Sequence, residues 1–373
     1  MQLLSAGGSD FWNASNSNCE FMLFIYRQAS LKSAPMHYIH ELITSSSWIA
    51  VVALIAAFAV LAKSADLFVD SSICIATRFN VPRMIIGIVL VSMGTTAPEL
   101  TVSLVSSLKG QPEMALGNAI GSVICDDGLA LPLCALTAVG TIAIAPHVLK
   151  VSCIYLVIIQ IVFCTFVLGD ATLDRVEGII LVTIFVVYIS QLLYSSRKKD
   201  ADTETLDPQH KDHSKDSMVK LSILFIISLA ALIFASDIIV SSATTIARGL
   251  NIPEFIIAVT MVALGTSVPE IATCITAARR GEGALAVGNI LGADVLNICW
   301  VAGASAIAND LIVHPPRQAH LMILSMVIIV STMLVMLRWG HSLTRRKGLV
   351  LLAMYVVYLL ATFLFFPPPV ETL

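Results

Sequence analysis

The sequence predicts an all-α polytopic membrane protein in which ten transmembrane helices form two inverted five-helix repeats. Three observations predict this fold class: an apolar composition, apolar runs of spanning length, and an internal repeat. Of the 373 residues, 57% are hydrophobic and 13% are charged, whereas ordinary globular domains have about 25% charged residues. This composition excludes an ordinary soluble domain.

The apolar runs define the individual helices. About 20 helical residues cross a hydrocarbon layer of roughly 30 Å, and a backbone in lipid must form its hydrogen bonds within the segment, which favours helix. We predict spans at 48–74, 83–107, 114–136, 147–168, 175–194, 219–247, 254–278, 284–308, 318–337 and 347–366. The eight cysteines lie mostly inside spans without metal-ligand spacing, so we interpret them as packing residues. The expected surroundings are the lipid bilayer, and a net charge of −3 without a basic patch gives no sign of a nucleic-acid partner.

The basic residues of the loops predict the orientation of the chain. With the N-terminus outside and ten alternating spans, fifteen lysine and arginine residues lie in cytoplasmic loops and six lie outside. This asymmetry predicts a multi-pass protein of the cell inner or plasma membrane with both termini outside. Asp66, Asp70 and Asp237 are interpreted as ordinary helix-end charges, and Lys63 can pair with Asp66 three residues away.

A hydrophilic loop divides the chain. Residues 197–218 carry charges of both signs and no aromatic residue, so we predict a flexible cytoplasmic linker. The predicted organisation is an N-terminal extension (1–47), a first repeat (48–196), this linker (197–218), a second repeat (219–366) and a C-terminal tail (367–373). The extension matches nothing in the second half, and because Met36 stands just before the first span, an over-long start is one explanation for residues 1–35.

The second half of the chain repeats the first. A shift of 171 residues aligns Gly94-Thr-Thr-Ala-Pro-Glu99 with Gly265-Thr-Ser-Val-Pro-Glu270 without gaps, and residues 61–130 share twenty identities with 232–301. Because each copy has five spans, an odd number, the second copy enters the membrane from the opposite side. In membrane transporters with such inverted repeats, the binding site lies near the middle of the membrane, where the repeats meet.

Each copy carries one glutamate deep in its second span, Glu99 or Glu270. A charged side chain at mid-bilayer costs at least roughly 2.5 kcal/mol, so it normally faces a polar cavity and a partner. The inverted symmetry brings the two carboxylates together, where they repel unless a cation or a proton lies between them. The alternative is a protonated carboxyl group that forms a hydrogen bond between helices.

The residues around these glutamates offer oxygen atoms of the kind that calcium binds. Calcium takes six to eight oxygens at about 2.3–2.6 Å. Pro98 and Pro269 cannot donate a backbone hydrogen bond, so carbonyl oxygens one turn earlier leave the helix ladder. The hydroxyl side chains on the same segments are Thr95, Thr96, Thr266 and Ser267.

The third span of each copy is expected to form the opposite wall of the site, because residues four apart share one helical face. This face carries Asn118, Ser122 and Asp126 in the first copy and Asn289, Ala293 and Asn297 in the second. Glycines of the same spans allow close helix packing. Helical phase turns the further acids Asp127 and Asp294 away from this face, so we interpret them as supporting or gating residues.

The segments GTTAPEL…GNAIGS and GTSVPEI…GNILGAD resemble the paired signature repeats of the cation/calcium exchanger superfamily, and most of all those of prokaryotic sodium/calcium exchangers. The resemblance is strongest over 92–127 and 263–298. It implies an antiporter rather than an enzyme, with calcium and sodium as transported ions and no cofactor. It also implies alternating access, in which the first and sixth helices slide across a core formed by the others.

The resemblance further implies roles for individual residues. Glu99 and Glu270 would be the calcium carboxylates, with the carbonyl oxygens of Thr95 and Thr266 beside them. The residues that would match sodium or central-site positions are Thr96, Ser267, Ser92, Ala263, Ser122, Asp126, Asn297, Asn118 and Asn289.

The chain departs from the family's pattern in two ways. Ala293 stands where a hydroxyl would complete one sodium site, and the Asp126/Asn297 pair is reversed, since the acid of sodium/calcium exchangers lies in the second repeat. The coupling ion therefore stays open between sodium, protons and additional potassium. A cation channel and an intramembrane protease are the remaining alternatives. The inverted repeat favours alternating access over a channel, and no histidine or lysine lies near Ser267 in either motif to activate a nucleophile.

Overall fold

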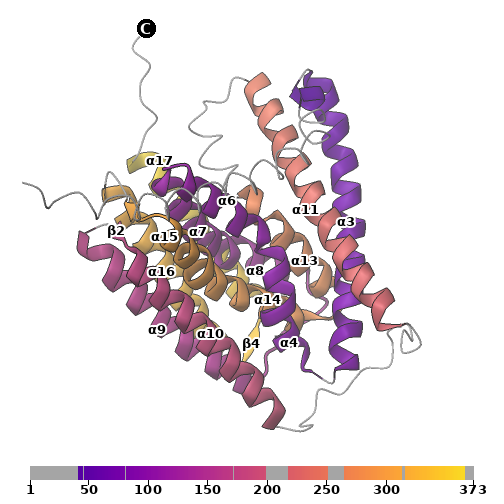
Figure 1. Cartoon of the computed structure of the whole chain (residues 1–373). Coiled ribbons are helices and arrows are strands. Elements are labelled where there is room, and N and C mark those ends of the chain that lie inside the picture. The colour runs from indigo at the N-terminus through magenta and orange to yellow at the C-terminus, as the bar shows by residue number, and fades with distance from the viewer. Residues whose placement is uncertain are drawn as a thin grey trace, which may run out of the picture.

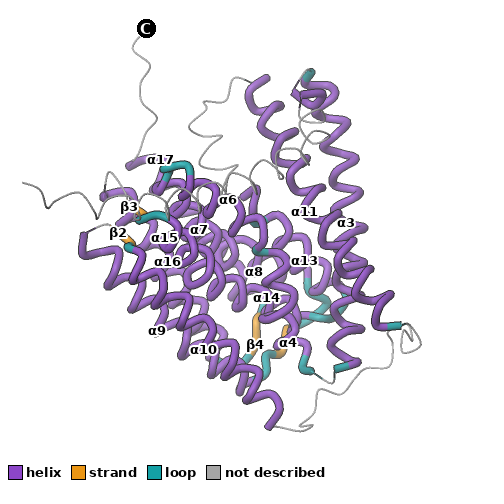
Figure 2. Tube along the Cα trace, viewed as in Figure 1, coloured by secondary structure: helices purple, strands orange, loops and turns teal. Residues whose placement is uncertain are grey.

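The computed structural model describes residues 41–44, 46–79, 81–170, 172–198, 217–250, 264–312 and 316–365. This part of the chain is helical, with four strands of two residues each (Figures 1 and 2). Outside it lie nearly all of the predicted extension (1–47) and linker (197–218), the tail (367–373) and the start of the seventh predicted span (254–263).

The helices of the two halves correspond. The first half contains α3 (Ser47–Arg78), α4 (Arg83–Ile86), the π-helix η1 (Gly87–Val91), α5 (Ser92–Thr95), α6 (Ala97–Leu108), α7 (Pro112–Cys125), the π-helix η2 (Asp126–Ala130), α8 (Leu131–Thr137), α9 (Pro146–Asp170) and α10 (Arg175–Lys198). The second half contains α11 (Met218–Gly249), α13 (Val268–Arg279), α14 (Gly283–Val295), the π-helix η4 (Leu296–Ala302), α15 (Gly303–Ala308), α16 (Pro316–Arg338) and α17 (Arg345–Phe365). Adding 171 to the bounds of α3 and α6 gives the bounds of α11 and α13, the offset that the sequence repeat has.

Seven helices of the described residues are long and apolar enough to cross a membrane, and a bent pair makes an eighth. The bent pair lies within the predicted second span at 83–107, where the helix breaks after Thr95 and turns by 45°. Of the other two predicted spans, 347–366 coincides with α17, and 254–278 is described only from residue 264 onward, where it ends in α13.

Two of these segments form the centre of the molecule. Within Pro112–Thr137 and Gly283–Ala308, 83% of the most apolar stretch is buried in the protein, against 28–39% in the other five. The central segments coincide with the predicted third span of each repeat. The remaining helices expose large apolar side chains on their outer faces, as helices in contact with lipid do.

Close helix contact at the centre depends on glycine. A Cβ atom added at Gly288 or Gly292 of α14 would strike the backbone of Met84 or Ile88 on the neighbouring segment. The backbones therefore pack directly on each other, which agrees with the predicted close approach at these two glycines.

The helices α3 and α11 pack along each other at one side of the molecule (Figure 1). The aromatic rings of Phe68 and Phe225 lie 4.8 Å apart between the two helices. Only 28% of the most apolar stretch of each helix is buried, so this pair forms an outer layer, which packs against α4, α5 and α13.

Two short antiparallel ladders connect the repeats. The strand β1 (Ile142–Ala143) pairs with β4 (Ser342–Leu343), and β2 (Thr172–Leu173) pairs with β3 (Leu311–Ile312). Each ladder joins a segment of the first half to one of the second. These strands were not predicted, because two residues are too few to show an alternating pattern.

Candidate cation-binding site

The two signature segments place each glutamate in the first turn of a helix. Pro98 and Glu99 lie in the first turn of α6, and Pro269 and Glu270 hold the same places in α13. Proline suits this turn because its missing N–H is not needed there. The positive end of the helix dipole lies at the same turn and favours a carboxylate.

The helix break leaves one carbonyl oxygen without a backbone partner. The backbone N–H of Thr96 bonds to Ser92 at 2.9 Å, and that of Leu100 bonds to Thr96 at 3.1 Å. Among the described residues, no backbone N–H bonds to the carbonyl oxygen of Thr95, which is fully buried. This is the distortion that Pro98 predicts, and it leaves an oxygen that can bind a ligand.

Both glutamates are buried, with 0% of Glu99 and 1% of Glu270 exposed. Oε1 of Glu270 accepts a hydrogen bond of 3.3 Å from the Thr96 hydroxyl. The other three carboxylate oxygens make no hydrogen bond with any described residue. The Glu99 carboxylate also lies within electrostatic range of Glu270 and Asp126. Burial of an uncompensated carboxylate is costly, so this group of acids needs protons or a cation.

Hydrogen bonds around the glutamates cross between the repeats. The Thr95 hydroxyl donates to Oδ1 of Asn289 at 3.3 Å, and the Thr266 hydroxyl donates to Oδ1 of Asn118 at 3.2 Å. These two bonds are equivalent at the offset of 171. The Ser122 hydroxyl lies 3.4 Å from that of Thr266 and adds a third link between the halves. The structure thus brings together the polar residues that the two motifs predict for the site.

Ser103 and Cys274 orient the two asparagines, and neither residue was predicted for the site. Nδ2 of Asn118 donates to the Ser103 hydroxyl at 2.9 Å, and Nδ2 of Asn289 donates to Sγ of Cys274 at 3.7 Å. A signal was present, because 103 and 274 are equivalent positions in the repeat. Their side chains fix the amide groups so that each Oδ1 faces a threonine of the opposite repeat.

Asp126 and Asn297 lie at equivalent positions in the π-helices η2 and η4, which often mark functional sites. Both side chains are buried, and none of their oxygen or nitrogen atoms has a hydrogen-bond partner among the described residues. Asp126 lies within electrostatic range of Glu270. The acid that departs from the family's pattern is thus beside the glutamate pair.

The remaining predicted residues have different settings. Ser267 is fully buried, and its hydroxyl has no partner among the described residues. The Ser92 hydroxyl donates to the carbonyl of Ile88 on its own helix. Ala263 lies outside the described residues. Within the described ranges, no three histidine, cysteine, aspartate or glutamate side chains form a metal-binding group.

Asp127 and Asp294 form a second acidic pair. Both are fully buried, and their carboxyl groups lie beside each other across the two repeats. Two carboxyl groups can form a hydrogen bond only when one of them carries a proton. The helical phase showed that Asp127 and Asp294 point away from the predicted wall of the site. It could not show that the two residues lie beside each other.

Arg280 corrects the interpretation of the acids on α3. Its guanidinium bonds to Asp70 and, at 3.0 Å, to Asp66. The predicted partner of Asp66 was Lys63, but the partner comes from the end of α13, 214 positions along the chain. Because this contact is made only in the folded protein, sequence spacing could not reveal it.

Comparison with known proteins follows the same division of the chain. A family model described as sodium/calcium exchanger protein matches residues 49–194 and 220–364. The chain belongs to the sodium/calcium exchanger protein family. The two matched ranges coincide with the predicted repeats, and this exchanger family is one of membrane transporters, as the resemblance implied.

Individual proteins of known sequence or structure are also similar to this chain. The inner membrane protein YrbG of Escherichia coli K12 is 32% identical over 87% of this chain and 99% of its own length. The sodium/calcium exchanger MaX1 of Methanosarcina acetivorans is 26% identical over 81% of this chain and 95% of its own. A solved structure of the sodium-calcium exchanger NCX_Mj matches with a TM-score of 0.71 and 26% identity, over 84% of this chain and 98% of that one. The fold is therefore that of a structurally known exchanger.

Proposed function

We propose that this chain is a secondary active antiporter that exchanges calcium for sodium at a site between two inverted repeats of five helices. The observation that carries the proposal is the buried pair of Glu99 and Glu270, three of whose four oxygens have no hydrogen-bond partner among the described residues. Two carboxylates match the charge of one calcium ion. The related NCX_Mj was studied with sodium and calcium, which supports the choice of these ions.

The proposed calcium ligands combine charged and neutral oxygens. Glu99 and Glu270 supply the carboxylates, and the carbonyl oxygens of Thr95 and Thr266 lie on the same broken segments. A hard cation that needs six to eight oxygens suits such a mixture. Sodium would use the surrounding oxygens of Thr96, Ser267, Ser92, Ala263, Ser122, Asp126, Asn297, Asn118 and Asn289.

Alternating access would arise from movement of α3 and α11 against the central segments. These two helices form an outer layer, and α11 touches both broken segments at glycine. A Cβ atom at Gly94 would meet Leu229, and one at Gly265 would meet Val240, both from α11. A shift of α11 would therefore act directly on the segments that carry the two glutamates.

Proton coupling is the second candidate, and Asp126 favours it. This carboxylic acid is buried beside the glutamates without a hydrogen-bond partner among the described residues. A proton could compensate its charge as well as a sodium ion could.

Calcium uptake into proteoliposomes distinguishes sodium coupling from proton coupling. An outward sodium gradient should drive calcium uptake. Uptake driven by a proton gradient alone would show that protons and not sodium are the coupling ion. Controls that contain potassium test whether potassium is transported as well.

The first prediction concerns the glutamates themselves. Glu99→Gln or Glu270→Gln should reduce calcium exchange by at least about 100-fold, because removal of one partner from a buried charge group costs roughly 3–5 kcal/mol, and 1.4 kcal/mol is about tenfold. Calcium exchange in proteoliposomes measures this loss.

Glu113→Gln is the matched control, since Glu113 is an exposed glutamate in the first turn of α7. The control should exchange calcium at the wild-type rate. Equal melting temperatures for all variants would show that the protein still folds. Wild-type exchange by either site variant would contradict the proposed calcium site.

A further inference from the structure

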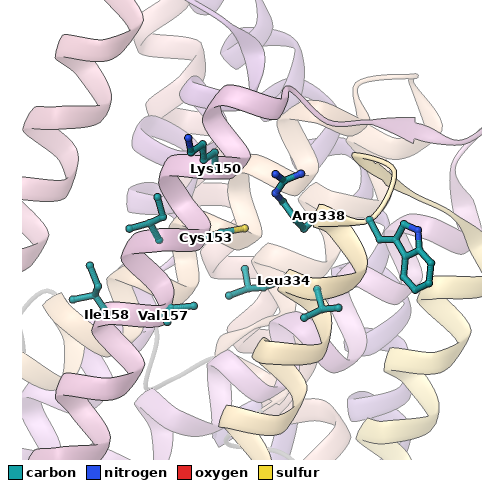
Figure 3. A pocket seen from close by; sticks show the side chains of 9 residues that line it. Lys150, Cys153, Val157, Ile158, Leu334 and Arg338 are labelled. Atoms are coloured by element: carbon teal, nitrogen blue, oxygen red, sulfur yellow. The ribbon is translucent and has the colours of Figure 1, made fainter.

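A groove runs along the outside of the protein between α9 and α16 (Figure 3). Its volume is about 750 Å³. On α9 the apolar part of its wall consists of Cys153, Ile154, Val157 and Ile158, positions that recur on one face of a helix. The side chains of Ile154, Val157 and Ile158 are 44–50% exposed, so the groove opens to the surroundings of the helix bundle.

The groove has one charged end. Lys150 begins its α9 wall and Arg338 ends its α16 wall, and Figure 3 shows the two on facing helices, with Val157 and Ile158 further along. From Lys150 to Ile158 the wall extends about 12 Å at 1.5 Å per residue. No acidic residue is among the described residues that line the groove. A positive end and an apolar length of about two helical turns are thus combined in one groove.

The charged end is held in place by neighbouring contacts. The Arg338 guanidinium lies 2.9 Å from Nε2 of His341. The Lys347 ammonium donates to the backbone carbonyls of Met336 and Trp339, each at 2.6 Å, and so closes the end of α16. Trp339 completes this end of the groove, at the level where tryptophan commonly meets the membrane–water interface.

The repeat provides an internal comparison. At the offset of 171, Lys150 corresponds to Leu321 and Arg338 corresponds to Val167. The equivalent helix surface at the other end of α9 and α16 therefore has neither basic residue. Both basic residues lie in the ends of α9 and α16 that lead into the β1–β4 ladder, on the side that the sequence predicts to be cytoplasmic.

We propose that this groove binds one anionic phospholipid, with its phosphate between Lys150 and Arg338 and an acyl chain along the apolar wall. Basic pockets between membrane helices on the cytoplasmic side suit anionic head groups. The apolar wall suits hydrocarbon, and a groove open to the bilayer admits a lipid from the side. A zwitterionic lipid would gain much less, because its head group has no net negative charge.

Native mass spectrometry of the full chain in detergent tests the proposal with phosphatidylglycerol and phosphatidylcholine as probes. Wild-type protein should retain phosphatidylglycerol in preference to phosphatidylcholine. Lys150→Gln/Arg338→Gln should weaken phosphatidylglycerol binding by about 25-fold, because each basic side chain near anionic lipid contributes roughly fivefold. Val157→Trp, which fills the groove without a change of charge, should weaken retention of this lipid as well.

The control is Arg279→Gln/Arg346→Gln, which removes two exposed basic residues that are outside the groove. This variant should bind phosphatidylglycerol as the wild type does. Equal losses in the groove and control variants would overturn the proposal, since general surface charge would then explain binding. Equal retention of both lipids by the wild type would also overturn the proposal. So would a wild-type protein that retains no lipid and forms a dimer that the groove variants do not form.

Discussion

Asp126 and Asn297 occupy equivalent positions, yet only one of them can carry a charge. Glu99 and Glu270 already supply two negative charges, enough for one calcium ion. A third ionised carboxylate beside them would leave net charge in a site of low dielectric. We therefore expect Asp126 to act on the monovalent partner of the exchange, with Asn297 as its neutral counterpart.

We expect Asp126→Asn to leave calcium binding nearly intact and to change the dependence of exchange on sodium, potassium or pH. The substitution keeps the shape of the side chain and removes its ionisation. Calcium binding by calorimetry and exchange rates across the three cation profiles measure the two effects.

A matched variant moves the acid to the other repeat. Asp126→Asn/Asn297→Asp keeps one acid at the centre, so it should restore much of the wild-type cation dependence. If all three profiles of Asp126→Asn overlay those of the wild type, Asp126 has no part in coupling.

Most of the candidate site could be predicted from the sequence, for a physical reason. Charged and amide side chains deep in apolar spans are costly, so Glu99, Asn118, Asp126 and their counterparts stand out. Ser103 and Cys274 did not stand out, because a single hydroxyl or thiol is common in a membrane helix. Their role depends on which side chain of another helix they face, and the sequence does not contain that geometry directly.

Arg280, at the C-terminal end of α13, connects this helix to the outer helix α3 through Asp66 and Asp70. The side chains are 27–43% exposed, and exposed ion pairs contribute about 0.2–1 kcal/mol. That is little for overall stability, but 1 kcal/mol still changes a conformational equilibrium by about fivefold. At the offset of 171, Asp66 corresponds to Asp237, but Asp70 corresponds to Ser241. The second repeat therefore lacks an acid at the position of Asp70.

We expect Arg280→Gln to shift the balance between the two access states by up to about fivefold, with little change in melting temperature. The bond between Arg280 and the two aspartates holds α3 against the end of α13. If α3 moves away from α13 in the other access state, the bond is lost there, so it favours the state in which it forms. Apparent calcium affinities measured from the two membrane faces, in vesicles of opposite orientation, report the shift.

Asp66→Asn/Asp70→Asn should reproduce the effect, because it removes the same contacts from the other side. Arg279→Gln is the control, as the adjacent exposed residue at the end of α13. A shift of the same size in this control would assign the effect to surface charge instead of to the bridge.

The elements themselves were predictable to different degrees. The break near Pro98 follows from chemistry at one position, and the bend is present there. The π-helices η1, η2 and η4 were not predicted. A buried helix is apolar on every face, so its sequence shows no clear periodic pattern in which a local change of helix type could be recognised. Their geometry depends on packing between repeats, as the glycine contacts of α14 illustrate.

For the whole molecule, the distribution of basic residues predicts the orientation. Residues 197–218 should face the cytoplasm, and a tag at the C-terminus should be accessible from outside intact cells. The physical reason is the preference of short basic loops for the cytoplasmic side, here fifteen residues against six. Protease sites introduced at both places, with intact and permeabilised cells, provide the measurement; a C-terminal tag exposed only after permeabilisation would reverse the orientation.

The overall architecture was largely predictable because apolar length and repetition are properties of the chain itself. The family model divides the chain where the sequence repeat does, into 49–194 and 220–364. The packing of α3 on α11, and of α9 on α16, required the structure, because any apolar helix surface fits several neighbours.

The two ladders have a consequence for the history of the molecule. At the offset of 171, β1 lies close to the position of β3, and β2 lies close to that of β4. Each ladder pairs a strand of one half with the non-equivalent strand of the other half, so each half supplies one strand to each ladder. In an ancestor with one five-helix gene product, such pairing would make an intertwined dimer of two molecules inserted in opposite directions. Fusion through a linker would have fixed those directions permanently. Only after fusion could natural selection place an acid at residue 126 and an amide at 297, because a homodimer must carry the same residue twice.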